Sequence, residues 1–127
     1  MARIEQGGTP IKTTEEARHI KGHHAEKIFA TLLLLAPNLE IIYEPTRFEH
    51  QNGGVVPDAT VPDFRVTNLQ TGIETFIEIT RSFRNGNDPK KRQKRIMREA
   101  APDTRYIVFY GEKLRALQDR RPEFNFF

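Results

Sequence analysis

The stretch from Val61 to Thr80 constrains the fold of this chain more than any other, because it has the pattern of two β-strands joined by a short turn. In residues 61–66 and again in residues 72–80, apolar and β-branched side chains recur at every second position, which is the period of a strand. Residues 68–72, Asn-Leu-Gln-Thr-Gly, have the composition of a turn. The stretch therefore predicts a β-hairpin around which the rest of the chain is organised.

Two carboxylates, Asp63 and Glu78, interrupt the apolar positions of this predicted hairpin. A charge beside core positions is costly unless it is paired, hydrogen-bonded or bound to a cation. Carboxylates on neighbouring strands can come close enough to share one hard cation. The alternative is that both side chains face water on the outer side of the hairpin, as charges on half-buried strands often do. The strand pattern alone leaves both interpretations open.

The composition limits the classes of protein and of site. A chain of 127 residues is long enough for one domain and too short for two ordinary ones. It contains no cysteine, which excludes thiolate metal sites, cysteine nucleophiles and disulfides. The longest apolar run, residues 30–37, is far shorter than a membrane span, and residues 1–5 lack an apolar signal region. We therefore expect a single soluble, cytoplasmic domain with no membrane contact.

Positive charge is concentrated in one segment. The net charge is only +3, yet residues 81–98 contain eight basic residues and a single acid, Asp88. Such a block suits a polyanion, most commonly nucleic acid. The alternative is a solvated helix face, which is usual for an isolated run of charges. Because the block directly follows Glu78, it is predicted to lie beside the carboxylates, and this favours nucleic-acid binding.

The other segments predict an α/β fold in which helices cover both faces of a sheet. Thr13 followed by Glu16 is a capping-box signature for a helix start, and Asp88-Pro89 is another start signal. We expect a flexible arm at 1–12, a helix at 13–35, a strand at 39–43, a loop or hairpin tip at 46–60, a turn at 85–87, a helix at 88–101, a strand at 106–110, a helix at 112–120 and a C-terminal tail at 121–127.

The first predicted helix carries an unusual glycine. Gly22 costs roughly 1 kcal/mol relative to alanine in a helix, which suggests close approach by another backbone or a ligand. Glu26 is four residues later and therefore shares its face. The alternative for Glu26 is a surface salt bridge. His23 and His24 have no partner at zinc spacing, so we expect them to be exposed.

In order and motif, these elements resemble the PD-(D/E)XK nuclease superfamily from about Thr14 to Tyr110. Pro62-Asp63 matches its Pro-Asp element, and Glu78 matches the second acidic position 15 residues later. Glu26 matches the glutamate that many members carry on the first helix. The resemblance implies a restriction-endonuclease-like fold, with a central mixed sheet of about four strands flanked by helices.

The resemblance also implies an endonuclease that hydrolyses DNA phosphodiester bonds with Mg²⁺ or Mn²⁺. Asp63 and Glu78 would be direct ligands of the metal, and Glu26 a ligand directly or through water. Such a cation supplies a hydroxide near neutral pH and stabilises charge on the phosphate. Backbone phosphates would be held, without reading of the bases, by Arg81, Arg84, Lys91, Arg95 and Arg98.

One position departs from the family pattern. The family has a lysine two residues after the second acid, and here that residue is Thr80. Some relatives carry the lysine on the following helix, where Lys90 and Lys94 are the candidate catalytic residues. If neither reaches the site, the protein would be a non-catalytic nucleic-acid-binding subunit that retains the fold. A third interpretation is a structural or toxin–antitoxin-like protein whose basic helix contacts an acidic partner. The sequence does not decide whether the nucleic acid is DNA or RNA. It also does not decide whether the protein is a monomer, a homodimer or part of a complex with a partner subunit.

Overall fold

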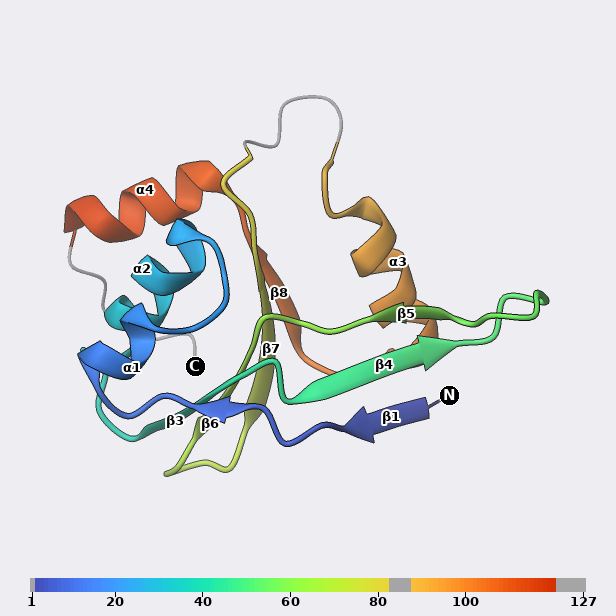
Figure 1. Cartoon of the computed structure of the whole chain (residues 1–127), viewed down its shortest axis with the longest axis horizontal. Coiled ribbons are helices and arrows are strands. Elements are labelled where there is room, and N and C mark those ends of the chain that lie inside the picture. The colour runs from blue at the N-terminus through green and yellow to red at the C-terminus, as the bar shows by residue number, and fades with distance from the viewer. Residues whose placement is uncertain (1, 83–87, 121–127) are drawn as a thin grey trace.

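The structure, a computed structural model, describes residues 2–82 and 88–120, without the side chains of Ala2 and of residues 116–120 (Figure 1). These residues form a mixed α/β fold with two sheets and four helices. The helices are α1 (Thr14–Arg18), α2 (His24–Leu33), α3 (Lys91–Ala100) and α4 (Gly111–Arg120). The strands are β1 (Ala2–Glu5), β2 (Thr9–Pro10), β3 (Leu39–Tyr43), β4 (Thr46–His50), β5 (Asp58–Thr60), β6 (Phe64–Asn68), β7 (Glu74–Ile79) and β8 (Tyr106–Phe109).

The central sheet has five strands in the order β2-β3-β6-β7-β8. Its first four strands are antiparallel to their neighbours, whereas β7 and β8 are parallel. The predicted hairpin is confirmed as β6 and β7, in which Phe64 faces Ile77. The turn between them contains Gly72 at φ +76°, a backbone conformation that favours glycine. The central sheet is therefore mixed, as expected, with one strand more than predicted.

Helices α1, α2 and α4 cover one face of this sheet, and α3 with the second sheet covers the other (Figure 1). The residues of β7 alternate between the two sides. Ile77 and Ile79 belong to the core beside α2, together with Phe29, whereas Phe76 packs with Met97 of α3. Glu78 has the parity of Phe76, so its side chain lies on the α3 side of the sheet. Because packed elements cover both faces of the sheet, the Glu78 carboxylate is buried.

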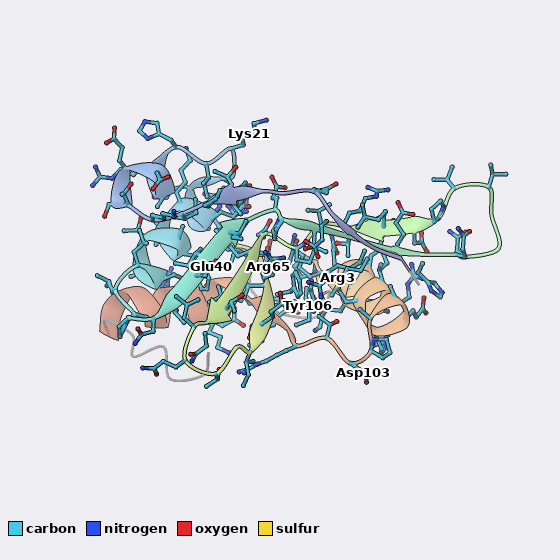
Figure 2. The ribbon with its side chains drawn as sticks, turned by 90° about the horizontal axis from the view of Figure 1, so that it is seen from below. Arg3, Lys21, Glu40, Arg65, Asp103 and Tyr106 are labelled. Atoms are coloured by element: carbon cyan, nitrogen blue, oxygen red, sulfur yellow. The ribbon has the colours of Figure 1, made fainter. Side chains whose placement is uncertain are left out.

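Within the arm expected at 1–12, residues 2–5 and 9–10 form strands β1 and β2. β1 pairs with β4 in a second sheet of order β1-β4-β5, and β2 pairs with the edge strand β3. Two ion pairs fix this segment on the central sheet: Arg3 with Glu74 at 3.4 Å and Arg65 with Glu5 at 3.1 Å (Figure 2). Cross-strand hydrogen bonds, which composition does not reveal, order the segment. Of the two expectations for residues 46–60, the hairpin is correct, since β4 and β5 pair there.

The predicted helix at 13–35 is wrong as one continuous element. α1 begins after the expected cap, since the hydroxyl of Thr13 accepts a hydrogen bond from the Glu16 amide at 3.1 Å. It ends at Arg18, and α2 starts at His24 with a new cap of its own. Gly22 lies between the two helices, where its low helix propensity permits the break. The apolar pattern continues across the break because both helices face the same core.

The second predicted helix starts later than expected. Asp88 is not its cap; its carboxylate accepts a hydrogen bond from the Lys90 amide at 3.0 Å, and α3 begins at Lys91. The strand near 106–110 and the helix near 112–120 are present as β8 and α4. The turn at 85–87 and the tail at 121–127 lie outside the described residues. Among the residues described, no helix has the length and apolar character needed to cross a membrane.

Candidate active site

The three acids predicted from the sequence lie together at one end of the central sheet. Asp63 comes just before β6, Glu78 is near the end of β7, and Glu26 is in the first turn of α2. The Ile79 amide donates a 2.7 Å hydrogen bond to Asp63, which ties that carboxylate to the strand that carries Glu78. Asp63 also interacts with the charges of Glu78 and Glu26, and shares a hydrogen bond with the Glu26 carboxyl. We call Glu26, Asp63 and Glu78 the acidic cluster.

Glu26 is held inward by its own helix start and by β3. Its two oxygens accept hydrogen bonds from the Tyr43 hydroxyl at 3.0 Å and from the His23 amide at 2.9 Å. The His23 ring nitrogen Nε2 lies 3.0 Å from the same oxygen as the amide. A Cβ added to Gly22 would lie 2.7 Å from the Glu26 carboxylate, so the close approach expected at this glycine comes from Glu26 itself. The Glu26 side chain is only 6% exposed, so the alternative that it forms a surface salt bridge is wrong.

Among the described residues, Lys90 is the one lysine or arginine that forms an ion pair with the acidic cluster, and it does so through Glu78. Lys90 Nζ lies 2.8 Å from Glu78 Oε2, and the Glu78 side chain is 7% exposed. The other oxygen, Oε1, is buried and has no hydrogen-bond partner among the described residues. Burial raises the pKa of Glu78, and the charge of Glu26 adds to the rise; the hydrogen bond and charge of Lys90 and a hydrogen bond from the Asp63 backbone offset only part of it. One oxygen of this carboxylate therefore lacks the partner that a buried charge requires.

The cluster as a whole is short of positive charge. Burial, reinforced by the charge of Glu78 and by the Glu26 carboxyl, raises the pKa of Asp63 to about 9. For Lys90, burial alone would lower the pKa, but the hydrogen bond and charge of Glu78 and the charges of Asp63 and Glu26 raise it. Lys90 thus remains an ammonium while Asp63 tends to hold its proton. Added positive charge would favour the ionised forms of Asp63 and Glu78.

The donor set of the cluster fits a hard divalent cation. Carboxylate oxygens are the ligands that Mg²⁺ prefers, and it commonly takes one or two of them and keeps several waters. The unpartnered Glu78 Oε1 marks where a cation would relieve a buried charge. In the described part of the chain, no group of three or more His, Cys, Asp or Glu side chains is arranged so that it could hold a metal ion. The residues therefore suit a cation that is held by few carboxylates. They do not suit a metal that needs thiolate or imidazole ligands.

Lys94, the second candidate lysine, lies in a different group. Its Nζ is 2.9 Å from Asp88 Oδ2 and 3.0 Å from the Tyr110 hydroxyl. Burial would raise the pKa of Asp88, but hydrogen bonds from Lys94, the Lys90 amide and Tyr110 lower it to about 2. Thr80 is buried, and its hydroxyl accepts a 3.2 Å hydrogen bond from the Ser82 amide. Of the candidates, Lys90 alone is placed at the acidic cluster.

The predicted phosphate-binding residues are divided between two sides of the sheet. Arg81 is exposed beyond β7 and lines a pocket with α2 and α4. Lys91 and Arg98 are exposed on α3, while Arg95 is drawn to Asp58 at 3.4 Å and to Glu99 at 3.6 Å. Arg84 lies outside the described residues. The basic helix is therefore partly neutralised by the second sheet.

Two residues beside Glu26 were not predicted to belong to the site. His23 was expected to be exposed and without a role; its side chain is 44% exposed, yet its amide and ring both contact Glu26. The His23-x-x-Glu26 spacing of a capping box is the sequence signal that could have indicated this contact. Tyr43 had no such signal, because its hydrogen bond joins residues 17 positions apart.

The chain was compared with protein-family models, with curated proteins and with solved structures, and none of the three comparisons found a match.

Proposed function

We propose that the protein is a metal-dependent endonuclease that hydrolyses DNA phosphodiester bonds on a restriction-endonuclease-like fold. The observation that carries this proposal is the convergence of Glu26, Asp63 and Glu78 on Lys90 at one end of the central sheet. Three acids and one lysine around an unpartnered oxygen are costly as a purely structural feature. Strongly shifted pKa values in such a group favour a functional site.

The order of elements supports the same proposal. An acid-bearing helix, α2, precedes the β6–β7 hairpin, and α3 connects β7 to the parallel strand β8. This is the succession on which the resemblance to the PD-(D/E)XK superfamily rests. Fold-level likeness raises the expectation of nuclease activity, but the acids and the lysine carry the argument.

The residues take distinct roles in the proposed reaction. Asp63 and Glu78 would hold Mg²⁺ or Mn²⁺, which when bound supplies a hydroxide near neutral pH and charge stabilisation. Glu26, fixed by Tyr43, presents a carboxylate that can orient a water. Lys90 keeps its proton and stabilises negative charge developing on the phosphate. Lys91 and Arg98 lie exposed on α3, where they can hold backbone phosphates.

A second candidate function is a nucleic-acid-binding subunit without catalysis. The hydrogen bond between Lys90 and Glu78 favours it, because a lysine bound to an acid leaves the site partly neutralised. In this alternative the group is a buried ion pair that stabilises the fold, and the basic residues alone carry the function. Both candidate functions predict salt-sensitive binding of nucleic acid, but only the endonuclease predicts cleavage.

Incubation of supercoiled plasmid with the protein and Mg²⁺ or Mn²⁺, with EDTA as control, tests the proposal. We expect nicking that EDTA stops and that Asp63→Asn reduces at least about 10²-fold, since one preorganised charged group is worth that much. Asp103→Asn is the matched control, because Asp103 is exposed and precedes β8 at the opposite end of the sheet. Salt-sensitive binding in Ca²⁺ without cleavage of plasmid, single-stranded DNA or RNA would overturn the proposal in favour of the non-catalytic subunit.

A further inference from the structure

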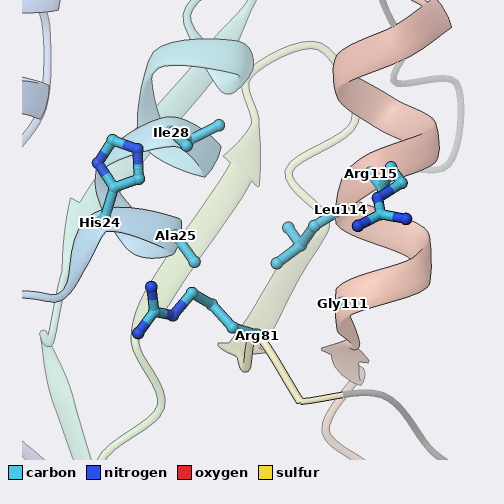
Figure 3. A pocket seen from close by; sticks show the side chains of 7 residues that line it. All are labelled: His24, Ala25, Ile28, Arg81, Gly111, Leu114 and Arg115. Carbon is cyan, nitrogen blue, oxygen red and sulfur yellow. The ribbon is translucent and has the colours of Figure 1, made fainter.

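A pocket of about 330 Å³ lies on the face of the sheet opposite α3, between α2, α4 and the segment that follows β7 (Figure 3). Its lining combines cationic and apolar side chains, and none of the described residues that line it is acidic. The residues used in the following argument are His24, Ala25, Ile28, Arg81 and Leu114.

The two kinds of side chain occupy different parts of the pocket. Arg81 extends from the end of β7 toward Ala25, while Ile28 of α2 and Leu114 of α4 line the pocket from its two helices (Figure 3). Guanidinium groups bind phosphate bidentately and also stack on flat aromatic rings. An anionic group attached to a flat apolar body therefore matches this lining. The volume lies near the lower end of ligand pockets, which suits one small molecule or one residue of a polymer.

Two segments of chain connect the lining of the pocket with the acidic cluster, whose own residues do not line the pocket. Ala25 in its wall is followed directly by Glu26, and adjacent Cα atoms are only about 3.8 Å apart. Arg81 follows two residues after Ile79, whose amide is bonded to Asp63. A strand whose phosphate is held at the acidic cluster would accordingly place a neighbouring nucleotide at the pocket.

We propose that this pocket receives a single unpaired nucleotide next to the phosphate that is cleaved. The base lies between Ile28 and Leu114, and the phosphate contacts Arg81. This inference rests on the proposed nuclease function, which it deepens by naming the substrate. A base reaches a pocket of this kind only after it leaves the stack, at a cost of a few kcal/mol in duplex and less where it is unpaired. The substrate is therefore DNA with an unpaired nucleotide at the cut, such as a single strand or a branch.

Titration of the full chain with deoxyadenosine monophosphate, inorganic phosphate and deoxyadenosine, followed by NMR or calorimetry, tests the pocket. We expect the nucleotide to bind most tightly, Arg81→Ala to weaken it about tenfold, and Ile28→Trp to abolish binding by filling the space. Arg18→Ala, which removes an exposed arginine of α1, should leave the affinity unchanged. Ile28→Ala, which adds no bulk, should weaken the nucleotide but not phosphate, and it keeps the test valid if the tryptophan variant does not fold.

Two outcomes would overturn the pocket proposal: equal nucleotide affinity in wild type and Arg81→Ala, or phosphate binding as tight as that of the nucleotide. The titration is repeated in Asp63→Asn without divalent cations, where nucleotide binding should persist. Nucleotide binding by the wild type, together with no wild-type cleavage of any DNA in Mg²⁺ or Mn²⁺, would refute the nuclease function and leave the pocket intact. Cleavage without nucleotide binding, or with no preference for unpaired over duplex DNA, would refute the pocket and leave the nuclease.

Discussion

Lys90 and Lys94 lie one helical turn apart and make bonds of nearly the same length, yet their surroundings differ. Lys90 Nζ is 2.8 Å from Glu78, and Lys94 Nζ is 2.9 Å from Asp88. Around Lys90 are three acids with one unpartnered carboxylate oxygen. Around Lys94 are one carboxylate and the Tyr110 hydroxyl, which satisfy one another. A short distance between a lysine and an acid therefore does not by itself distinguish a candidate catalytic group from a structural one.

Charge balance and burial make the distinction. The Glu78 side chain is 7% exposed and its pKa is raised, chiefly by burial. Asp88 is 16% exposed, and its pKa is lowered to about 2, because the hydrogen bonds that it accepts outweigh its burial. Around Lys90 the protonated forms of Asp63 and Glu78 are favoured, whereas around Lys94 the charged form of Asp88 is favoured. We infer that the Lys94 group stabilises the start of α3, and that this places Lys90 at the acidic cluster.

The largest expected effect comes from exchanging the two lysines for alanine one at a time. Lys90→Ala should lower the single-turnover cleavage rate about 10²–10³-fold, the usual cost of removing one preorganised transition-state donor. Lys94→Ala should change the rate less than about threefold, because Lys94 does not contact the acidic cluster. DNA affinity in Ca²⁺ should stay near the wild-type value in both, since the loss concerns the transition state.

Lys90→Arg controls for charge, because it keeps the cation and changes its shape. Wild-type cleavage by Lys90→Ala would show that Lys90 does not supply the lysine that is missing at position 80. A larger loss of cleavage rate in Lys94→Ala than in Lys90→Ala would show that Lys94, and not Lys90, is the catalytic lysine.

The second prediction is that the two groups contribute to stability with opposite pH dependence. The folded-state pKa of Asp63 is about 9 against an ordinary 3.8, so the folded protein holds a proton that the unfolded chain releases. Asp63 thus contributes stability that is complete below pH 4 and is lost as pH rises toward 9. Asn carries no such proton, so Asp63→Asn should become progressively more stable than wild type from pH 5 to pH 9. Chemical denaturation in EDTA measures the difference.

Asp88→Asn should show the reverse. The pKa of Asp88 is lowered from 3.8 to about 2, so its contribution is complete above pH 4 and is lost as pH falls through about 2. The variant should therefore be less stable than wild type at neutral pH and equal to it below pH 2. If Asp63→Asn proves less stable than wild type at pH 8, the Asp63 carboxylate is satisfied in the folded protein and the acidic cluster needs no cation.

The sequence predicted those parts of the site that depend on local periodicity. Alternation in 61–66 and 72–80 identified β6, which Asp63 directly precedes, and β7, which carries Glu78, because the period of a strand fixes side-chain direction within a few residues. Helical projection likewise placed Lys90 and Lys94 on the sheet-facing flank of α3. That projection could not separate them, because residues four apart share a face.

The sequence failed where partners are distant or where a local signal competed with packing. β1 and β2 lie in a segment with little apolar pattern, and only pairing with β4 and β3 orders them. The break between α1 and α2 is masked by an apolar pattern that continues through it. The hydrogen bond from Tyr43 to Glu26 depends on how β3 packs on α2, which no spacing along the chain records.

The third prediction tests the packing at Gly22. In Gly22→Ala the new Cβ would meet the Glu26 carboxylate, which must then move away from Tyr43 and His23. We expect cleavage to fall by up to about tenfold, roughly the value of one hydrogen bond to a charged group, with little loss of stability. Glu26→Gln is the matched background. In that variant Gly22→Ala should lower the cleavage rate by a smaller factor than in the wild type, since the two changes act on one group. Full additivity would mean that Gly22 acts independently of Glu26.

The smallest effect concerns the exposed cations of α3, which repeat the comparison between balanced and unbalanced charge. Arg92 and Arg95 are each 3.4 Å from Asp58, whereas Lys91 and Arg98 make no ion pair with any residue that the structure describes. Lys91→Ala with Arg98→Ala should lower the slope of log affinity against log salt by about two, because each phosphate contact contributes about 0.9. Adding Arg95→Ala should lower it by less than one further unit, since Asp58 already neutralises that arginine. Fluorescence anisotropy with labelled DNA at several salt concentrations measures the slopes. An unchanged slope in the double variant would show that this face of α3 is only solvated, and that bound DNA lies on the Arg81 side of the sheet instead.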